Sequence, residues 1–169
     1  HRSWLYYDHA RRLLERLDLW YDAADVSSDS KRQQQWKNKY YNTLLRQAGV
    51  ALNTELKKLN LGLERLQTAE KIIPQDPHVY YAKGLLYSTE SDEHPAELEL
   101  AIENYKKALA LAEEQKNEGA PANYHFQLAI ALEQKDRFEQ AEQHFEKAIE
   151  KEPYKAHYLN YLGYMYSLR

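Results

Sequence analysis

Apolar residues recur at steps of three and four positions along nearly the whole chain of 169 residues. One stripe runs from Trp4 to Ala24, and a second runs from Trp36 to Leu59 without a break. This period places side chains on one face of a helix, whereas a half-buried strand would alternate at every second residue. Only five glycines and five prolines are available for turns. The chain is therefore predicted to be all-α.

Proline, glycine and capping residues indicate where the helices begin and end. The second stripe is expected to end at about Asn60 and Gly62, and a third helix is expected to end before Pro74. Asp136 is followed three residues later by Glu139, a capping-box pattern with Asp in place of Ser or Thr. Helix starts are predicted at four places: Asp76 with Pro77, His94 with Pro95, Pro121, and Asp136.

Charge and composition exclude several classes of function. Residues 1–60 hold 11 basic and 7 acidic residues, whereas residues 61–169 hold 12 basic and 19 acidic ones. Nucleic acid is bound through clustered Lys and Arg, so an acidic C-terminal part argues against it. The mean hydropathy is −0.86, and no apolar run is long enough to span a membrane. The sequence has no cysteine, so disulfides and thiolate zinc sites are excluded. A chain without cysteine fits the cytoplasm and the periplasm equally well, so the compartment is not predicted.

A repeat of 34 residues is visible near the C-terminus. Gly163 lies 34 residues after Ala129, and the neighbouring apolar positions match as well. The matched residues are His125, Leu128 and Leu132 in the first copy and Leu159, Leu162 and Tyr166 in the second. A fixed period of this length is typical of stacked repeat units.

Small residues recur on the predicted helix that follows the first of these copies. Ala141 and Ala148 lie seven residues apart with Phe145 between them, and Pro153 ends the helix. A side chain larger than methyl at either alanine would push a paired helix away. Together with the first-helix positions above, this pattern resembles the tetratricopeptide repeat family.

The resemblance implies a right-handed superhelical solenoid of antiparallel helix pairs with an N-terminal helical extension. It predicts five segments: an N-terminal capping section (1–42), a degenerate repeat (43–76), a repeat with insertions (77–121), a regular repeat (122–155) and the first helix of a truncated repeat (156–169). The 11 extra residues between Gly84 and Ala129 are expected in a loop over 88–93 and in a longer helix end at 113–117. Because the last helix lacks a partner, we expect the chain to be cut from something longer.

No catalytic signature occurs in the sequence. Glycine-rich phosphate loops, HExxH, GxSxG and EF-hand patterns are all missing. His125 occupies a core aromatic position and is expected to be packed and hydrogen-bonded rather than catalytic. His78 and His157 should face the inner surface but are two repeats apart, which makes a joint metal site improbable. The chain is predicted not to be an enzyme and to need no cofactor or metal.

In the resembled family, positions two, five and nine of each first helix line the concave surface. Here these positions are His78, Tyr81, Leu85, Asn123, Phe126, Ile130, His157, Asn160 and Tyr164. The rings and aliphatic side chains are expected to form a contact floor, and Asn123 and Asn160 to hydrogen-bond a partner's backbone. The set contains no Lys or Arg, so a clamp for a carboxylate terminus is disfavoured.

These observations predict a non-catalytic interaction module that binds a protein or peptide segment in an apolar and aromatic groove. Two alternatives remain open. The chain could assemble with itself through Leu159, Leu162 and Met165 on its last helix, giving a homo-oligomer. It could also be the regulatory or interaction part of a larger enzyme.

Overall fold

The computed structural model describes residues 16, 30–52, 59–90, 95–115 and 121–167. Over these ranges every regular element is an α-helix, as the spacing of apolar residues predicted. The helices are α2 (Ser30–Leu52), α3 (Leu59–Ile72), α4 (Pro77–Glu90), α5 (Pro95–Glu114), α6 (Ala122–Glu133), α7 (Phe138–Lys151) and α8 (Ala156–Ser167). Except for Arg16, the first predicted stripe, Trp4 to Ala24, lies outside the described residues.

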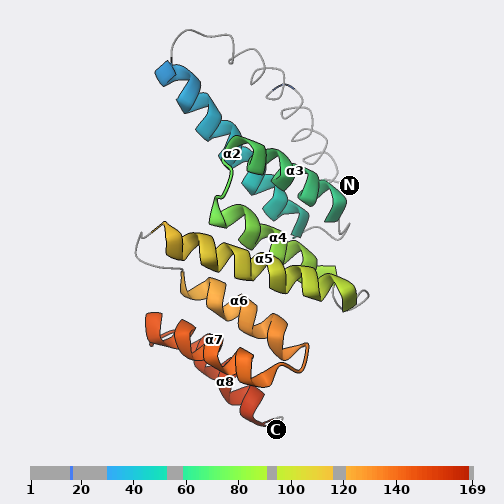
Figure 1. Cartoon of the computed structure of the whole chain (residues 1–169), viewed down its shortest axis with the longest axis vertical. Helices are drawn as coiled ribbons and strands as arrows, with labels where there is room; N and C mark the ends of the chain where they lie inside the picture. The colour runs from blue at the N-terminus through green and yellow to red at the C-terminus, as the bar shows by residue number, and fades with distance from the viewer. Residues whose placement is uncertain (1–15, 17–29, 53–58, 91–94, 116–120, 168–169) are drawn as a thin grey trace.

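The helices stack along the long axis of the molecule, from α2 and α3 at one end to α7 and α8 at the other (Figure 1). Helix α2 pairs with α3, α4 with α5, and α6 with α7. The first helices of neighbouring pairs also touch, α2 against α4 and α4 against α6. Each pair therefore contacts mainly its neighbours, which is the organisation of an all-α solenoid.

Small residues are buried where the helices approach one another. Six alanines have no exposed surface: Ala69, Ala101, Ala108, Ala129, Ala141 and Ala148. This confirms the prediction that the small positions lie at helix contacts, because methyl-sized side chains let the helix axes come close. Phe145, between Ala141 and Ala148, is also fully buried and fills the space beside them.

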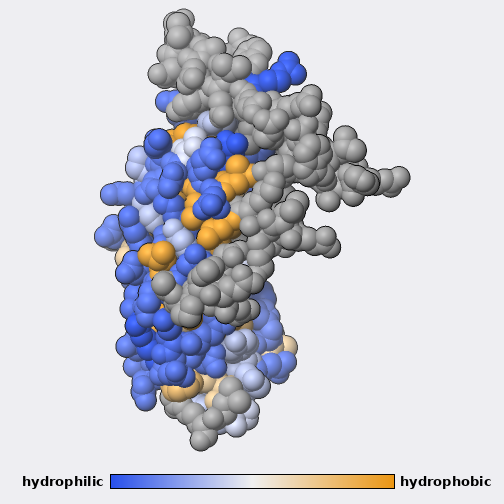
Figure 2. All heavy atoms as spheres, turned by 90° about the vertical axis from the view of Figure 1, so that its right-hand side faces the viewer, coloured by the Kyte–Doolittle hydropathy of each residue, from blue (hydrophilic) through white to orange (hydrophobic). Residues whose placement is uncertain are grey.

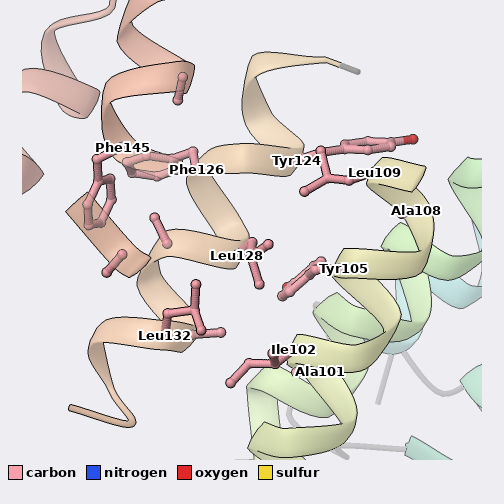
Figure 3. Close-up of a cluster of buried hydrophobic side chains, with 14 of the residues drawn as sticks. Ala101, Ile102, Tyr105, Ala108, Leu109, Tyr124, Phe126, Leu128, Leu132 and Phe145 are labelled. Carbon is pink, nitrogen blue, oxygen red and sulfur yellow. The ribbon is translucent and has the colours of Figure 1, made fainter. Parts of the chain in front are cut away.

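Buried side chains form two hydrophobic clusters along the stack. The smaller joins α2, α3 and α4, and the larger extends from α4 to α8. In Figure 3, Ile102 and Tyr105 on α5 point toward Leu128 and Leu132 on α6. The larger cluster thus holds the second and third helix pairs together and carries α8 at its far end.

Two predicted helix starts are confirmed at Pro77 and Pro95. Asp76 Oδ1 accepts a hydrogen bond of 2.8 Å from the backbone N–H of His78, so Asp76 caps α4 as expected. Part of the extra length of this repeat lies in its helices. Helix α4 continues to Glu90, through the start of the loop predicted over 88–93, and α5 has 20 residues against 14 in α7.

The predicted break at Asn60 and Gly62 is wrong. Helix α2 ends at Leu52, and both residues lie inside α3. Gly62 is buried there, on the same face as Leu66 and Ala69. Gly62 is therefore a close-packing residue within a helix. Helix α2 also runs through the boundary expected between residues 42 and 43.

The capping box predicted at Asp136 is also wrong. Asp136 has a φ of 56° and ends the turn after α6, while Arg137 precedes the first residue of α7. The backbone N–H of Asp136 donates to Glu133 O, and the backbone N–H of Arg137 donates to Leu132 O, both at 2.9 Å. This is the Schellman arrangement, whose left-handed position is usually occupied by Gly but tolerates a short polar side chain.

No described helix is both long and apolar enough to cross a membrane.

Candidate partner-binding face

The nine residues expected to contact a partner lie on α4 and α6, the first helices of two successive pairs, and on α8, which follows the second of these pairs. We call these residues the first-helix face. Seen from one side, the described surface of the molecule is mostly hydrophilic, with a few hydrophobic patches (Figure 2). The nine residues differ in exposure. Exposed members are His78, Asn123, His157, Asn160 and Tyr164, and half-buried members are Tyr81, Leu85 and Ile130. Phe126 is buried, with 7% of its surface exposed.

Three of the nine residues meet around a tyrosine that the sequence analysis did not select. The Tyr81 ring stacks on the Tyr124 ring, with centroids 4.3 Å apart and planes 13° from parallel. Asn123 Nδ2 donates to the Tyr81 hydroxyl at 3.2 Å. The edge of His78 faces the Tyr124 ring at 6.2 Å. Helices α4 and α6 thus share an aromatic surface edged by one amide and one imidazole.

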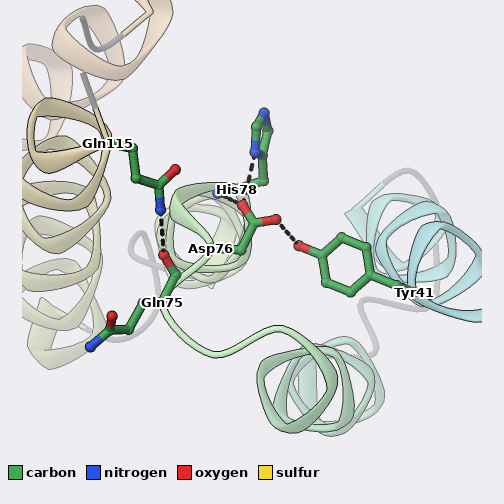
Figure 4. Close-up of polar contacts among 5 residues, drawn as sticks. All are labelled: Tyr41, Gln75, Asp76, His78 and Gln115. Atoms are coloured by element: carbon green, nitrogen blue, oxygen red, sulfur yellow. Dashed lines mark hydrogen bonds and ion pairs between the residues drawn. The ribbon is translucent and has the colours of Figure 1, made fainter. Parts of the chain in front are cut away.

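The carboxylate of Asp76 organises the polar edge of this surface (Figure 4). Its Oδ1 accepts from the backbone N–H of His78 and lies 2.9 Å from Nδ1 of the same residue. Its Oδ2 accepts from the Tyr41 hydroxyl at 2.5 Å. A single side chain therefore caps α4, orients the His78 ring and ties α2 to α4.

These contacts shift the acidities of both partners. Partial burial acts to raise the pKa of Asp76, but hydrogen bonds from His78 and Tyr41 outweigh it and hold that pKa below its usual value. The hydrogen bond to Asp76 raises the pKa of His78, although burial opposes this. The positive form of His78 is thus favoured more than in a free histidine, because the ionised Asp76 lies beside it.

Phe126 was expected to belong to the exposed contact floor, but the structure places it in the core. Its ring lies 5.7 Å from Phe145 on α7 and 4.5 Å from Tyr158 on α8. Tyr161 and the edge of His157 contact it as well, at 5.7 and 5.2 Å. The reason is that α8 follows directly and covers the ring. Phe126 therefore joins three helices instead of facing a partner.

The remaining residues form a looser group. Leu85 and Ile130 pack against the larger core cluster and offer only part of their surface. On α8, Tyr164 is 57% exposed and its ring lies 6.3 Å from that of Tyr161. Asn160 is exposed on the same helix. This half of the face is open, but it is less closely connected than the group around Tyr124.

Sequence reasoning missed Tyr41 and Tyr124. Tyr124 directly follows Asn123, one of the expected groove residues, and Tyr41 follows Tyr40 in the stretch that forms α2. Tyr124 is 2% exposed, and its hydroxyl has no hydrogen-bond partner among the described residues. No helical pattern marks either residue, because their importance comes from contacts between different helices.

His125 is packed and hydrogen-bonded, as expected. It is 4% exposed, and its Nδ1 lies 3.1 Å from Nδ1 of His144. In the described part of the chain, no group of three or more His, Cys, Asp or Glu side chains is placed to hold a metal ion. The first-helix face offers rings, amides and one imidazole paired with a carboxylate, which suit recognition of another molecule.

The chain resembles known repeat proteins in sequence and in fold. Residues 96–151 match the tetratricopeptide repeat family. No curated protein matches the chain. The crystal structure of MamA is similar, with a TM-score of 0.60 and 18% identity over 93% of this chain and 81% of that chain.

Two further solved structures agree with this fold. The MamA RS-1 ArsTM double mutant has a TM-score of 0.53 at 24% identity, covering 90% of this chain and 90% of that chain. A point mutant of MamA has a TM-score of 0.50 at 19% identity, covering 80% of this chain and 94% of that chain. Residues 96–151 therefore match the tetratricopeptide repeat family, and the paired helices and buried alanines give the chain an all-α solenoid fold similar to that of the MamA structures.

Proposed function

We propose that this chain is a non-catalytic module that binds a segment of another protein along the first-helix face. The family match and the fold support a role in protein interaction or scaffolding. A solenoid presents the same positions of successive first helices side by side, which makes a continuous surface for a guest.

The observation that carries the proposal is the group around Tyr124. Tyr81 offers part of its ring and its hydroxyl, and Asn123 offers its carbonyl and a second N–H. Rigid rings edged by hydrogen-bonding groups are common anchors at interfaces, because they bury much area at small entropic cost. The exposed ring of Tyr164 and the amide of Asn160 extend this chemistry onto α8.

The partner's chemistry is limited by charge. None of the nine residues is Lys or Arg, and the imidazole of His78 is already paired with the carboxylate of Asp76. A peptide C-terminus that carries two carboxylates would therefore find no lysine or arginine among these residues to pair with. We expect a segment that presents apolar or aromatic side chains and backbone amides.

Alanine substitutions of exposed residues test this proposal without disturbing the core. An Asn123→Ala, Tyr164→Ala double variant should lose most partner capture from native lysate while keeping its helicity and melting temperature. Tyr154→Ala is the matched control, because Tyr154 is a 97% exposed tyrosine in the turn before α8. Equal capture by the double variant and the wild type would contradict the proposal.

Self-assembly is the second candidate, and exposed residues on α8 favour it. Leu159 and Tyr166 are 48% and 47% exposed, beside the still more exposed Tyr164. Met165, which was expected in this patch, is fully buried, and Leu162 is half-buried. The patch is therefore more aromatic than expected. Light scattering at high concentration separates the two candidates, since a monomer at all concentrations removes this one.

A further inference from the structure

Two histidines face each other across the contact between α6 and α7. Nδ1 of His125 lies 3.1 Å from Nδ1 of His144, and the rings stack with centroids 5.3 Å apart and planes 26° from parallel. His125 is 4% exposed and belongs to the buried face of α6, beside Leu128 and Ala129. His144 comes from the middle of α7, next to the buried Phe145.

A hydrogen bond between two Nδ1 atoms constrains the protons of the pair. One Nδ1 must carry a proton and the other must offer its lone pair, so the two neutral rings are opposite tautomers. A first added proton keeps this bond but places a charge inside the helix contact. A second added proton puts two N–H groups face to face, which breaks the bond and sets two positive charges together.

Apart from the histidines themselves, the described charged side chains that shift the pKa of either ring are all lysines. Lys147 and Lys151 on α7 and Lys106 on α5 are the charged side chains whose fields act on one ring or the other. No carboxylate contributes to the shift of either ring. Burial is the largest cause, and it lowers the pKa of each histidine from 6.5 to about 4 together with the lysines and, for His125, the proximity of His144. Both rings are therefore neutral at pH 7 and resist protonation only while the helices stay packed.

We propose that the His125–His144 pair is an acid-sensitive latch that holds α6 against α7 at neutral pH and releases it as the pH falls. Helix α6 carries Asn123 and Phe126, which contact α4 and α8 respectively. Loosening α6 therefore disturbs the first-helix face on both sides. The latch makes the shape of this repeat depend on pH, independently of which molecule the face binds.

Proton linkage gives the direction in which the stability of the chain changes with pH. The unfolded histidines have a pKa of 6.5 and the folded ones have a lower pKa, so the unfolded state binds more protons between these values. Stability is fully present above pH 6.5, falls as the pH drops toward 4, and changes no further through this pair below that value. The Asp76 carboxylate acts at more acidic pH, since its pKa lies below 3.8.

A metal site is the competing interpretation of the pair. The separation of 3.1 Å suits two nitrogen ligands on one ion. However, no third His, Cys, Asp or Glu joins them within the described ranges, and the neighbouring charges are lysines that repel a cation. The arrangement therefore favours a shared proton over a shared metal.

Urea unfolding of the full chain between pH 7.5 and 4 tests the latch. The reference is a His125→Phe, His144→Leu double variant, which keeps an aromatic ring at position 125 and removes both titrating groups. From pH 6.5 to 4.5 the unfolding constant of the wild type should rise at least tenfold more than that of the variant. Parallel curves for wild type and double variant would overturn the proposal.

Nitrogen NMR of the wild type gives a readout that does not depend on the variants folding. We expect the rings of His125 and His144 to be neutral and of opposite tautomer at pH 6. At pH 5.5 each ring should still be less than half protonated. A ring that titrates near pH 6.5, or two rings of the same tautomer, would overturn the latch.

Discussion

Gly84 lies directly against the ring of Tyr105, and a β-carbon added at Gly84 would be 2.5 Å from Cε1 and 2.6 Å from Cδ1 of that ring. Tyr105 is fully buried, and its hydroxyl lies 3.1 Å from Oγ of Ser88, so the ring cannot move aside freely. This contact between α4 and α5 shows in one place why the solenoid needs small residues.

Gly84→Ala is therefore expected to destabilise the chain by about 1–3 kcal/mol, because overpacking forces the ring or the helix to shift. Urea unfolding measures the loss. Gly163→Ala is the matched control, since nothing lies within 4 Å of an added β-carbon there and Gly163 is exposed in α8. That variant should gain up to about 1 kcal/mol from helix propensity. Similar effects at both positions would contradict the packing account.

Phe126→Ala should destabilise the chain by about 3–5 kcal/mol, as expected for removal of a buried aromatic ring. The ring joins α6, α7 and α8, so its loss should also reduce the packing of α8. Thermal unfolding and hydrogen exchange of α8 measure the two effects. Tyr164→Ala, at an exposed ring, should change stability by no more than about 0.5 kcal/mol. An unchanged melting temperature for Phe126→Ala would restore the sequence-based expectation that this ring faces a partner.

Asp76→Ala should cost about 1–2 kcal/mol through loss of the α4 cap. It also leaves the Tyr41 hydroxyl without its acceptor in a residue that is 6% exposed. Asp76→Asn keeps an oxygen that can accept from the backbone N–H of His78, so it should cost less. Urea unfolding at pH 7 compares the two variants. A larger loss for Asn than for Ala would show that the cap is not what Asp76 contributes.

The His78–Asp76 pair should show a pH dependence opposite to that of the buried histidines. The folded pKa of His78 is raised above 6.5, so its contribution to stability is fully present below pH 6.5 and is lost as the pH rises through the folded value. Proton NMR of the His78 ring should give a lower pKa in Asp76→Asn than in the wild type. An identical pKa in both proteins would show that Asp76 does not hold the imidazolium.

Much of the fold could be predicted from the spacing of a few residue types. Ala141, Phe145 and Ala148 are buried together because residues three, four and seven apart share one face of a helix. Pro77 and Pro95 begin helices because a proline fits the first turn. In each case the cause is local in the chain, and the sequence displays it directly.

The candidate face was harder to predict, because exposure depends on neighbouring helices. Phe126 occupies a position that lines the concave surface in related repeats, yet Tyr158 and Tyr161 cover its ring. The contacts of Tyr124 with Tyr81 and of His125 with His144 also join different helices. Asp136 was misinterpreted for another reason, since a helix cap and a left-handed turn residue favour the same short polar side chains.

Site-specific photo-crosslinking tests most directly whether a partner lies along the first-helix face. A photoreactive phenylalanine analogue is placed at Asn123, Asn160 or Tyr164, and at Gln140 or Gln143 on the exposed side of α7 as controls. The account predicts that the three face positions crosslink to one and the same partner segment in native lysate and that the two α7 positions do not. Crosslinking from α7 alone, or from none of the face positions, would contradict the account.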